Sequence, residues 1–264
     1  MQLTDLIAVM EKIAPPSLAE SWDNPGLLIE PEGDEITRVL VALDCTPTVA
    51  REAIARGTQL VITHHPLFFK PVKRMYHSAP DTAAAYLLIR HGIGLYAAHT
   101  NLDCALGGVN DALAAAIGLV NIRALEADAQ GDAPGIGRTG DLTAPIRLKA
   151  LAGDIRDRLN AAVRYGGDPD RLIRTVAVVG GSGGDCIEQA KFAGADVLVT
   201  GELKHSQAIA AQIVGICVIE AGHYETERVV LPDLVAGLQS ALDTIQYKVD
   251  LLTAQTEHAP LLAP

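Results

Sequence analysis

Residues 39–63 read VLVALDCTPTVAREAIARGTQLVIT, and residues 176–200 read VAVVGGSGGDCIEQAKFAGADVLVT. With an offset of 137 and no gap, Gly57 aligns with Gly194, and both stretches end in threonine. Each predicts a buried strand, a turn, a helix stopped by glycine and a second strand. Such units build parallel α/β sheets. The repeat predicts an α/β fold of two related halves with mostly parallel sheets, unless it is a chance likeness between two ordinary βαβ units.

The length of 264 residues suits one large domain or two ordinary ones. We expect a first α/β half at 1–120 and a second half at 146–264. Residues 121–145 are rich in Gly, Asp, Ala and Pro and are predicted to form a connecting loop. The connection is followed by a predicted strand near 146–150 and a predicted helix near 155–163.

The composition excludes several classes of protein. Apolar residues make up 49% of the chain, which excludes a disordered protein. A net charge of -11 argues against non-specific nucleic-acid binding. No apolar run reaches the ~20 residues that span a bilayer, and the N-terminus lacks the basic start of a secretory signal. Four widely spaced cysteines without C-x-x-C fit neither a disulfide framework nor a cysteine-rich zinc module, so we expect a cytoplasmic protein.

A second overlay, with an offset of 124, connects the ends of two later strands. It places His223 on His99 and Glu227 on Asp103, so both halves follow a strand with His-x-x-x-carboxylate. Chance explains the match of a histidine and an acid at fixed spacing less readily than it explains the match of the strands alone.

Three predicted strands therefore end in residues that bind metal ions: His64 and His65, His99 to Asp103, and His223 to Glu227. Ligands of parallel α/β folds gather at the carboxyl ends of strands, and imidazole with carboxylate suits zinc, iron or manganese. Adjacent histidines at a strand end tend to point to opposite sides, which suits two neighbouring ions. His223 and Glu227 share a face if their segment is helical, and the glutamate can bridge two ions.

Other interpretations of these residues stay open. His64 and His65 can be capped or partly buried histidines, and Asp103 can bind backbone amides in an Asx-turn. His223 and Glu227 can lie in a solvated helix start. His99 can orient the loop after its strand, belong to the outer shell of a metal site or shuttle protons.

Two further segments carry polar groups near predicted strand ends. Gly180–Gly184 follows a strand and can cradle a phosphate, although a tight turn explains its glycines equally well. Gly201–His205, which includes Glu202, occupies in the second repeat the place of the adjacent histidines in the first. It can line the same cavity.

Several motifs occur together and in a fixed order, and the set is specific. They are Ser21-Trp22-Asp23-Asn24-Pro25-Gly26-Leu27, Leu43-Asp44-Cys45-Thr46, Thr63-His64-His65-Pro66-Leu67, His99-Thr100-Asn101-Leu102-Asp103, Thr200-Gly201-Glu202-Leu203-Lys204-His205 and Gly222-His223-Tyr224-Glu225-Thr226-Glu227. Over about 250 residues the chain resembles the Nif-three-like family, also called GTP cyclohydrolase I type 2 homologues. It departs from the family pattern at Glu30, where glycine is common, and at Ser206, where a second histidine is common.

The resemblance implies a dinuclear centre of two divalent metal ions per subunit. Its ligand positions fall on His64, His65, Asp103, His223 and Glu227, with the last as the bridge. It also implies a toroidal homohexamer and a short form without the mid-chain inserted domain of longer relatives. The implied function is a metal-dependent hydrolase acting through an activated water on a small nucleotide-like, cyclic amide or phosphoester substrate. The alternative is a non-catalytic ring that chaperones metals or docks regulatory partners.

Overall fold

The computed structural model describes residues 1–125 and 135–261, which form two compact units. The first unit consists of Met1–Ala105 together with Leu231–His258, and the second consists mainly of Leu106–Val230. These bounds differ from the expected halves, because the chain enters the second unit before residue 120 and returns to the first after Val230. Each unit is described by itself below.

The first unit is built on a five-stranded sheet in the order β1-β4-β3-β2-β11. Strands β2, β3, β4 and β11 run parallel, and β1 pairs with β4 in the antiparallel direction. Its elements are α1 (Leu3–Ile13), η1 (Pro16–Leu18), β1 (Gly26–Ile29), β2 (Arg38–Ala42), α2 (Pro47–Arg56), β3 (Leu60–Thr63), α3 (Ala83–Arg90), β4 (Gly94–Ala97), α4 (Thr100–Cys104), α10 (Val230–Thr244) and β11 (Asp250–Thr253).

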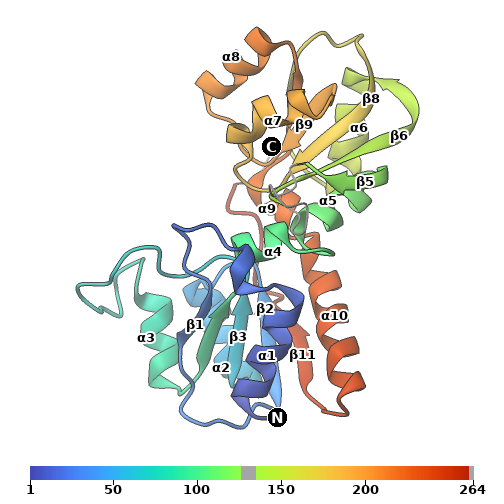
Figure 1. Ribbon diagram of the computed structural model, residues 1–264. Coiled ribbons are helices and arrows are strands. Elements are labelled where there is room, and N and C mark those ends of the chain that lie inside the picture. The colour runs from blue at the N-terminus through green and yellow to red at the C-terminus, as the bar shows by residue number, and fades with distance from the viewer. Residues whose placement is uncertain (126–134, 262–264) are drawn as a thin grey trace. The chain divides into compact units, whose positions relative to one another are not determined.

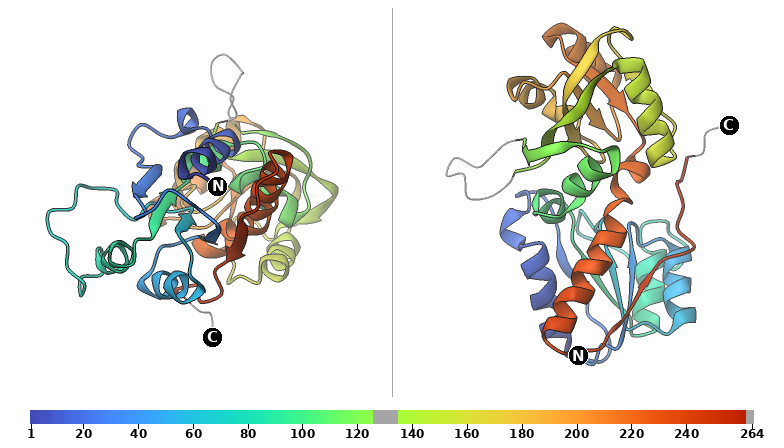
Figure 2. Two further views of the ribbon diagram at one scale, coloured as in Figure 1. Left: turned by 90° about the horizontal axis from the view of Figure 1, so that it is seen from below. Right: turned by 90° about the vertical axis from the view of Figure 1, so that its right-hand side faces the viewer.

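Helices cover both faces of this sheet. The right-hand view of Figure 2 shows α2 and α3 on one side of the sheet and α1 and α10 on the other. The central strands between them are therefore largely apolar and buried, as in β3, where all four residues are buried. Local signals fix α2: Thr46 accepts a hydrogen bond from the backbone amide of Val49, Pro47 opens the helix, and Gly57 ends it at a φ of 64°.

The second unit is built on a six-stranded sheet in the order β5-β6-β8-β9-β10-β7. Its centre, β8-β9-β10, is parallel, and the outer strands pair in the antiparallel direction. Helices α5 and α6 pack on one face of the parallel strands, and α7 and α8 pack on the other (Figure 1). The elements are α5 (Val109–Ile117), β5 (Val120–Ala124), β6 (Arg138–Arg147), α6 (Leu148–Leu159), β7 (Arg164–Gly166), β8 (Leu172–Val179), η2 (Gly184–Cys186), α7 (Ile187–Phe192), β9 (Val197–Thr200), α8 (His205–Val214), β10 (Cys217–Glu220) and α9 (His223–Glu227).

The repeat extends to the register of the strands. Val39 pairs with Leu60 in the first sheet, and Val176 pairs with Val197 in the second, so both partners differ by 137. The mixed α/β fold with two related sheets is thus confirmed. At the next strand the register gives an offset of 123 instead of 124, because β3 pairs Leu60 with Gly94 while β9 pairs Val197 with Cys217. By this register His223 corresponds to Thr100, and these two residues begin the equivalent helices α9 and α4.

The connecting region is more ordered than expected. Most of strands β5 and β6 falls within 121–145, where a loop is predicted, and the part at 126–134 is outside the described residues. Antiparallel strands at the edge of a sheet tolerate polar residues and glycine, so the sequence of β5 and β6 lacks the apolar pattern of a buried strand. The predicted strand at 146–150 is also wrong beyond Arg147, since α6 begins at Leu148. Among the described helices, none is long and apolar enough to cross a membrane.

Glu52 fastens the C-terminal segment to the first unit. Its carboxylate accepts hydrogen bonds from the backbone amides of Gln255 and Thr256 and from the hydroxyl of Thr256, at 2.7–3.0 Å, and pairs with Arg56 at 2.8 Å. Burial works to raise the pKa of Glu52, but the hydrogen bonds from Thr256, Gln255 and Arg56 outweigh it and hold the pKa below 4.5. The charged form therefore stabilises the fold.

Substituting Glu52→Gln should lower the free energy of unfolding of the first unit by about 2 kcal/mol, because the acceptor of these hydrogen bonds loses its charge and the bonds become weaker. Since the pKa is lower in the folded state, this contribution is complete above pH 4.5 and disappears as pH falls through the folded pKa. Urea unfolding followed by the fluorescence of Trp22 at pH 7 and pH 3 measures both effects. The exposed Glu30→Gln variant is the control, and equal stability of the two variants at pH 7 would contradict the role of Glu52.

Candidate metal centre

Three histidines meet beyond the carboxyl ends of β3 and β4 in the first unit. One ring nitrogen of each of His64, His65 and His99 lies within 4.8 Å of the others. The ring centroids of His64 and His65 are 4.9 Å apart, so the adjacent pair does not point to opposite sides as predicted. Alternation ends with β3 at Thr63, whose hydroxyl donates to the carbonyl of His65 at 2.8 Å and turns the chain.

Each of these rings is oriented through Nδ1 by an oxygen atom. His64 Nδ1 lies 2.9 Å from the carbonyl oxygen of Ala98, His65 Nδ1 lies 2.9 Å from Asp44, and His99 Nδ1 lies 2.8 Å from Asp23. A carbonyl or carboxylate oxygen can only accept a hydrogen bond, so Nδ1 carries the proton in each ring. Nε2 then presents the lone pair that a metal ion requires.

Asp103 adds a carboxylate to this group. It lies in α4 and is 7% exposed, and its Oδ1 is 3.6 Å from Nε2 of His64. Metal–nitrogen and metal–oxygen bonds of about 2.0–2.2 Å place two tetrahedral ligand atoms roughly 3.3–3.5 Å apart, so this spacing suits two ligands of one ion. Asp103 lies in a helix and its carboxylate faces His64, so the Asx-turn interpretation does not apply.

The sequence marks Asp23 only as part of a motif, whereas in the structure its side chain orients a histidine of the site. Its side chain is fully buried and accepts hydrogen bonds from His99 and from the backbone amide and hydroxyl of Thr100. Burial opposes the charged form, but these hydrogen bonds outweigh it and lower the pKa of Asp23 below 3.8. Burial and the neighbouring His64 lower the pKa of His99 below 6.5, against the effect of Asp23. No periodicity marks Asp23, because it lies in an irregular loop.

The C-terminal segment contributes a further carboxylate. Glu257 accepts hydrogen bonds from the backbone amides of Leu43 and Asp44, and burial raises its pKa above 4.5. The contact of Asp44 with His65 suits Asp44 to an outer-shell role that orients the imidazole. The neighbouring thiol of Cys45 is unsuited to bind metal, because burial together with Asp44 and Glu257 raises its pKa to about 12.

The second unit holds a histidine and a carboxylate one helical turn apart. His223 and Glu227 are the first and last residues of α9, and His223 Nε2 lies 3.1 Å from Glu227 Oε2. Their shared face confirms the helical i, i+4 geometry predicted for the segment. Glu227 is buried to 4% exposure. The pair therefore offers one imidazole and one carboxylate at a separation suited to a common ion.

Glu202 orients His223. Glu202 Oε1 lies 3.2 Å from His223 Nδ1, and its Oε2 accepts a hydrogen bond from the Ser182 hydroxyl at 3.0 Å. This carboxylate–imidazole contact fixes the ring in the way that Asp44 fixes His65. His205, in contrast, begins α8 and lines a separate pocket of about 350 Å³ with Tyr165.

The glycine loop Gly180–Gly184 wraps closely around Glu227. A Cβ added at Gly181, which has a φ of 59°, would clash with Glu227 Oε1 and lie 3.1 Å from His223 Nε2. A Cβ at Gly201 would lie 2.7 Å from the backbone of His223. These glycines leave space for the His223–Glu227 pair, and the following helices η2 and α7 have only three and six residues. The structure therefore favours a packing role for this loop beside the Glu227 carboxylate over the binding of a phosphate.

The chemistry of the donors fits divalent metal ions in both units. The first unit brings together His64, His65, His99 and Asp103, and the second brings together His223 and Glu227. All are nitrogen or carboxylate-oxygen donors, the set preferred by zinc, iron and manganese.

Comparisons with known proteins assign the chain to a family. A family model described as Duf34/NIF3 (NGG1p interacting factor 3) matches residues 1–260. A Clostridium perfringens protein named GTP cyclohydrolase 1 type 2 homolog is 34% identical over 245 residues, covering 92% of this chain and 94% of that protein. A solved Bacillus cereus protein related to NIF3 aligns at a TM-score of 0.95 with 26% identity, covering 100% and 99% of the two chains. A solved Staphylococcus aureus hypothetical protein aligns at a TM-score of 0.93 with 33% identity, covering 100% of this chain and 99% of that chain. The chain belongs to the Duf34/NIF3 family.

Proposed function

We propose that the two groups of donors hold a centre of two divalent metal ions, zinc, iron or manganese, and that the protein is a metal-dependent hydrolase. His64, His65, Asp103, His223 and Glu227 would hold the ions, and Glu227, which has two carboxylate oxygens, would be shared between them. The observation that carries the proposal is the orientation of the imidazoles: oxygen acceptors at Nδ1 leave Nε2 of His64 and His65 as lone-pair donors.

Bound divalent ions would acidify a water molecule and polarise an electrophilic carbon or phosphorus of the substrate. The chain's own residues divide the other tasks. Asp44 and Glu202 hold the rings of His65 and His223 in ligating orientation. His99, fixed by Asp23 and 5.2 Å from the ring of His64, moves protons to and from the reacting group. The proposed substrate is a small nucleotide-like, cyclic amide or phosphoester molecule, and a relative's name, GTP cyclohydrolase 1 type 2 homolog, supports the nucleotide-like class.

Metal content tests the centre. His64→Ala and Glu227→Gln, one ligand from each unit, should each bind less metal than the natural protein, because the remaining donors hold the ions less tightly. Elemental analysis of purified protein measures the stoichiometry, with the exposed His91→Ala variant as control. Undiminished metal in both ligand variants would overturn the site.

A screen of metal-loaded protein against nucleotides, pterins, small phosphoesters and cyclic amides tests hydrolysis. Turnover that disappears in Glu227→Gln supports the enzyme. Metal bound without turnover of any of these substrates favours the non-catalytic ring that chaperones metals or docks partners.

The contact between Glu202 and His223 gives a sharper prediction. Glu202→Ala should weaken zinc binding by about 10- to 100-fold, because the imidazole loses the carboxylate that orients it and raises its basicity. Competition with a chelating dye measures the affinity. Glu188→Ala, an exposed glutamate on α7 in the same unit, is the matched control. Equal zinc affinity of the two variants would show that Glu202 does not support a metal ligand.

We also propose that the chain assembles as a cytoplasmic homohexamer. The second unit supports assembly through exposed apolar side chains on α7 and α8: Phe192 is 96% exposed and Ile213 is 79% exposed. Exposed apolar groups of this size are typical of contact surfaces. The chain has a mass of 27.8 kDa. Light scattering after size exclusion should give six times this mass for the natural protein and a smaller species for Phe192→Asp. A monomeric natural protein would contradict the hexamer.

A further inference from the structure

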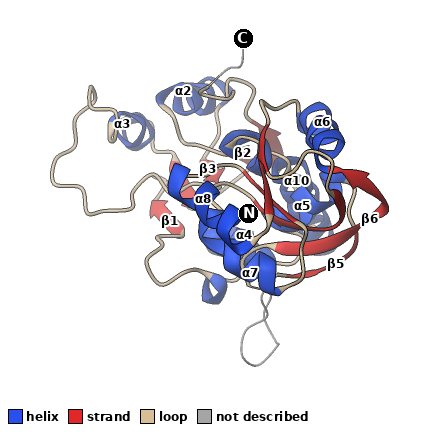
Figure 3. Cartoon of the chain, turned by 90° about the horizontal axis from the view of Figure 1, so that it is seen from above, coloured by secondary structure: helices blue, strands red, loops and turns tan. Residues whose placement is uncertain are grey.

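The loop 66–82, between β3 and α3, differs in charge from the rest of the chain. Figure 3 shows it as a long segment without regular structure ahead of α3. It carries Lys70, Lys73 and Arg74, all exposed, in a protein with a net charge of -11. Within the described part of the chain, no carboxylate forms an ion pair with these three side chains. Their charges are therefore available to an anion from solution.

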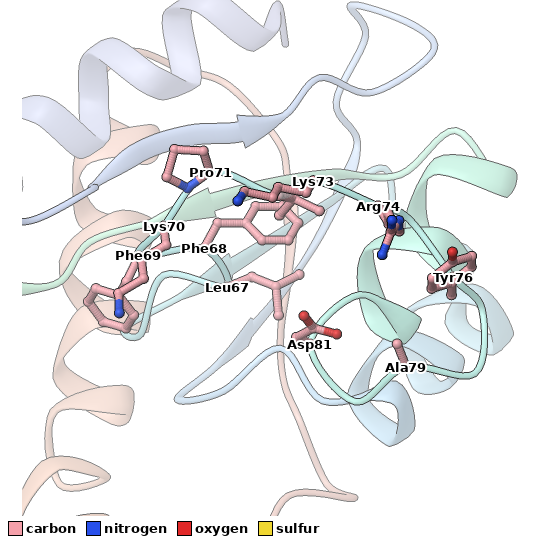
Figure 4. Close-up of a pocket in the computed structure, with 11 residues that line it drawn as sticks. Leu67, Phe68, Phe69, Lys70, Pro71, Lys73, Arg74, Tyr76, Ala79 and Asp81 are labelled. Carbon is pink, nitrogen blue, oxygen red and sulfur yellow. The ribbon is translucent and has the colours of Figure 1, made fainter.

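The same loop forms the wall of a pocket. The pocket has a volume of about 600 Å³, within the range of small-molecule sites. Figure 4 shows Phe69 and Lys70 at one end, Lys73 along its length, and Tyr76 and Asp81 at the other end. Asp81 repels an anion from its own end, so the charge pattern favours an anion beside Lys70 and Lys73.

Two exposed aromatic rings stand where this wall meets the histidines. Phe69 is 52% exposed and Trp22 is 61% exposed, and their ring centroids are 6.4 Å apart with an interplanar angle of 31°. Each ring meets His99 edge to face, at 5.5 Å and 6.0 Å. The aromatic pair therefore borders the cluster of His64, His65 and His99.

The position of the aromatic pair is fixed by hydrogen bonds. Asn24 Nδ2 donates to the carbonyl of Phe68 at 2.6 Å and ties the loop to the Trp22 segment. Asp23, between these residues, is held by His99 and Thr100. A second pocket, of about 440 Å³, is lined by Asp23, Asn24 and Phe69 and shares Lys70 with the first.

The ring geometry limits how a ligand can bind. A planar ligand between two rings needs a gap of about 7 Å, twice the 3.5 Å contact distance, and parallel walls. The pair is too close and too tilted for this, so a flat ligand stacks on the solvent-facing side of the aromatic pair. Its anionic group then reaches the cations that follow Phe69 in the loop.

We propose that Trp22, Phe69, Lys70 and Lys73 form a binding site for a phosphorylated planar heterocycle, of which a purine nucleoside monophosphate is the simplest example. The binding site names the substrate class of the proposed hydrolase. It rests on that function only where the bound molecule is identified as the substrate. The ring stacks on the aromatic pair beside the histidines, and the phosphate binds the two lysines. The net charge of -11 opposes the binding of an extended nucleic-acid strand, so a single nucleotide is the proposed ligand.

The single tryptophan, Trp22, reports binding directly through its fluorescence. The probe is GMP, added to chelator-treated full-length protein, so that phosphate cannot bind through a metal ion. Saturable quenching is expected for GMP, about tenfold weaker binding for guanosine, which lacks the phosphate, and no quenching by ribose 5-phosphate. The affinity for GMP should fall with added salt.

Variants separate the two contacts. Lys70→Gln with Lys73→Gln should weaken GMP about tenfold and leave guanosine unchanged, whereas Phe69→Leu should weaken both about tenfold. The matched controls, Lys248→Gln and Tyr247→Leu, change an exposed lysine and an exposed aromatic residue elsewhere and should bind normally. Equal GMP affinity of the loop and control variants would overturn the site.

Two outcomes identify what has failed. Tighter binding of a single-stranded oligonucleotide than of GMP, rising with its length, would replace the nucleotide site with a nucleic-acid surface. Metal bound at the ligands together with no GMP quenching would refute this inference alone. GMP quenching in a protein whose metal content is unchanged by His64→Ala and Glu227→Gln would refute the metal centre alone.

Discussion

The site depends on a simple constraint: oxygen atoms that can only accept hydrogen bonds face one nitrogen of each histidine. The carbonyl of Ala98 and the carboxylates of Asp44 and Asp23 define the protonated nitrogen of His64, His65 and His99. Glu202 has the same relation to His223 in the second unit. Because these oxygens belong to strand ends and their adjoining loops, the parallel sheets determine the direction in which each imidazole presents its lone pair.

The two related sheets repeat part of this arrangement in each unit. The pairing of β2 with β3 and that of β8 with β9 agree residue by residue at an offset of 137, so Thr63 and Thr200 end equivalent strands. Beyond those residues the chemistry diverges, with two histidines in one unit and glycine and glutamate in the other. Gly201 allows the backbone of His223 to approach closely in the second unit, whereas the histidines supply donors in the first.

The fold class and the grouping of the donors within each unit could be predicted because they follow from short patterns. Apolar runs reveal buried parallel strands, and His223 with Glu227 requires only a single helical turn. The strands β5 and β6 could not be found this way, since their polar residues and glycine conceal the alternation. The close approach of the rings of His64 and His65 depends on a turn after Thr63, and the role of Asp23 depends on the path of a loop.

The return of the chain to the first unit has a consequence for its biosynthesis. β11 pairs with β2, and their Arg38–Asp250 contact joins residues 212 positions apart. A ribosome therefore releases all of Leu106–Val230, a continuous stretch, before the nascent first sheet receives its edge strand. During that interval β2 has an open edge that can pair with another chain. Residues 250–257 close that edge and bring Glu257 to the backbone amide of Asp44, so the first unit is completed only after the second unit has been synthesised.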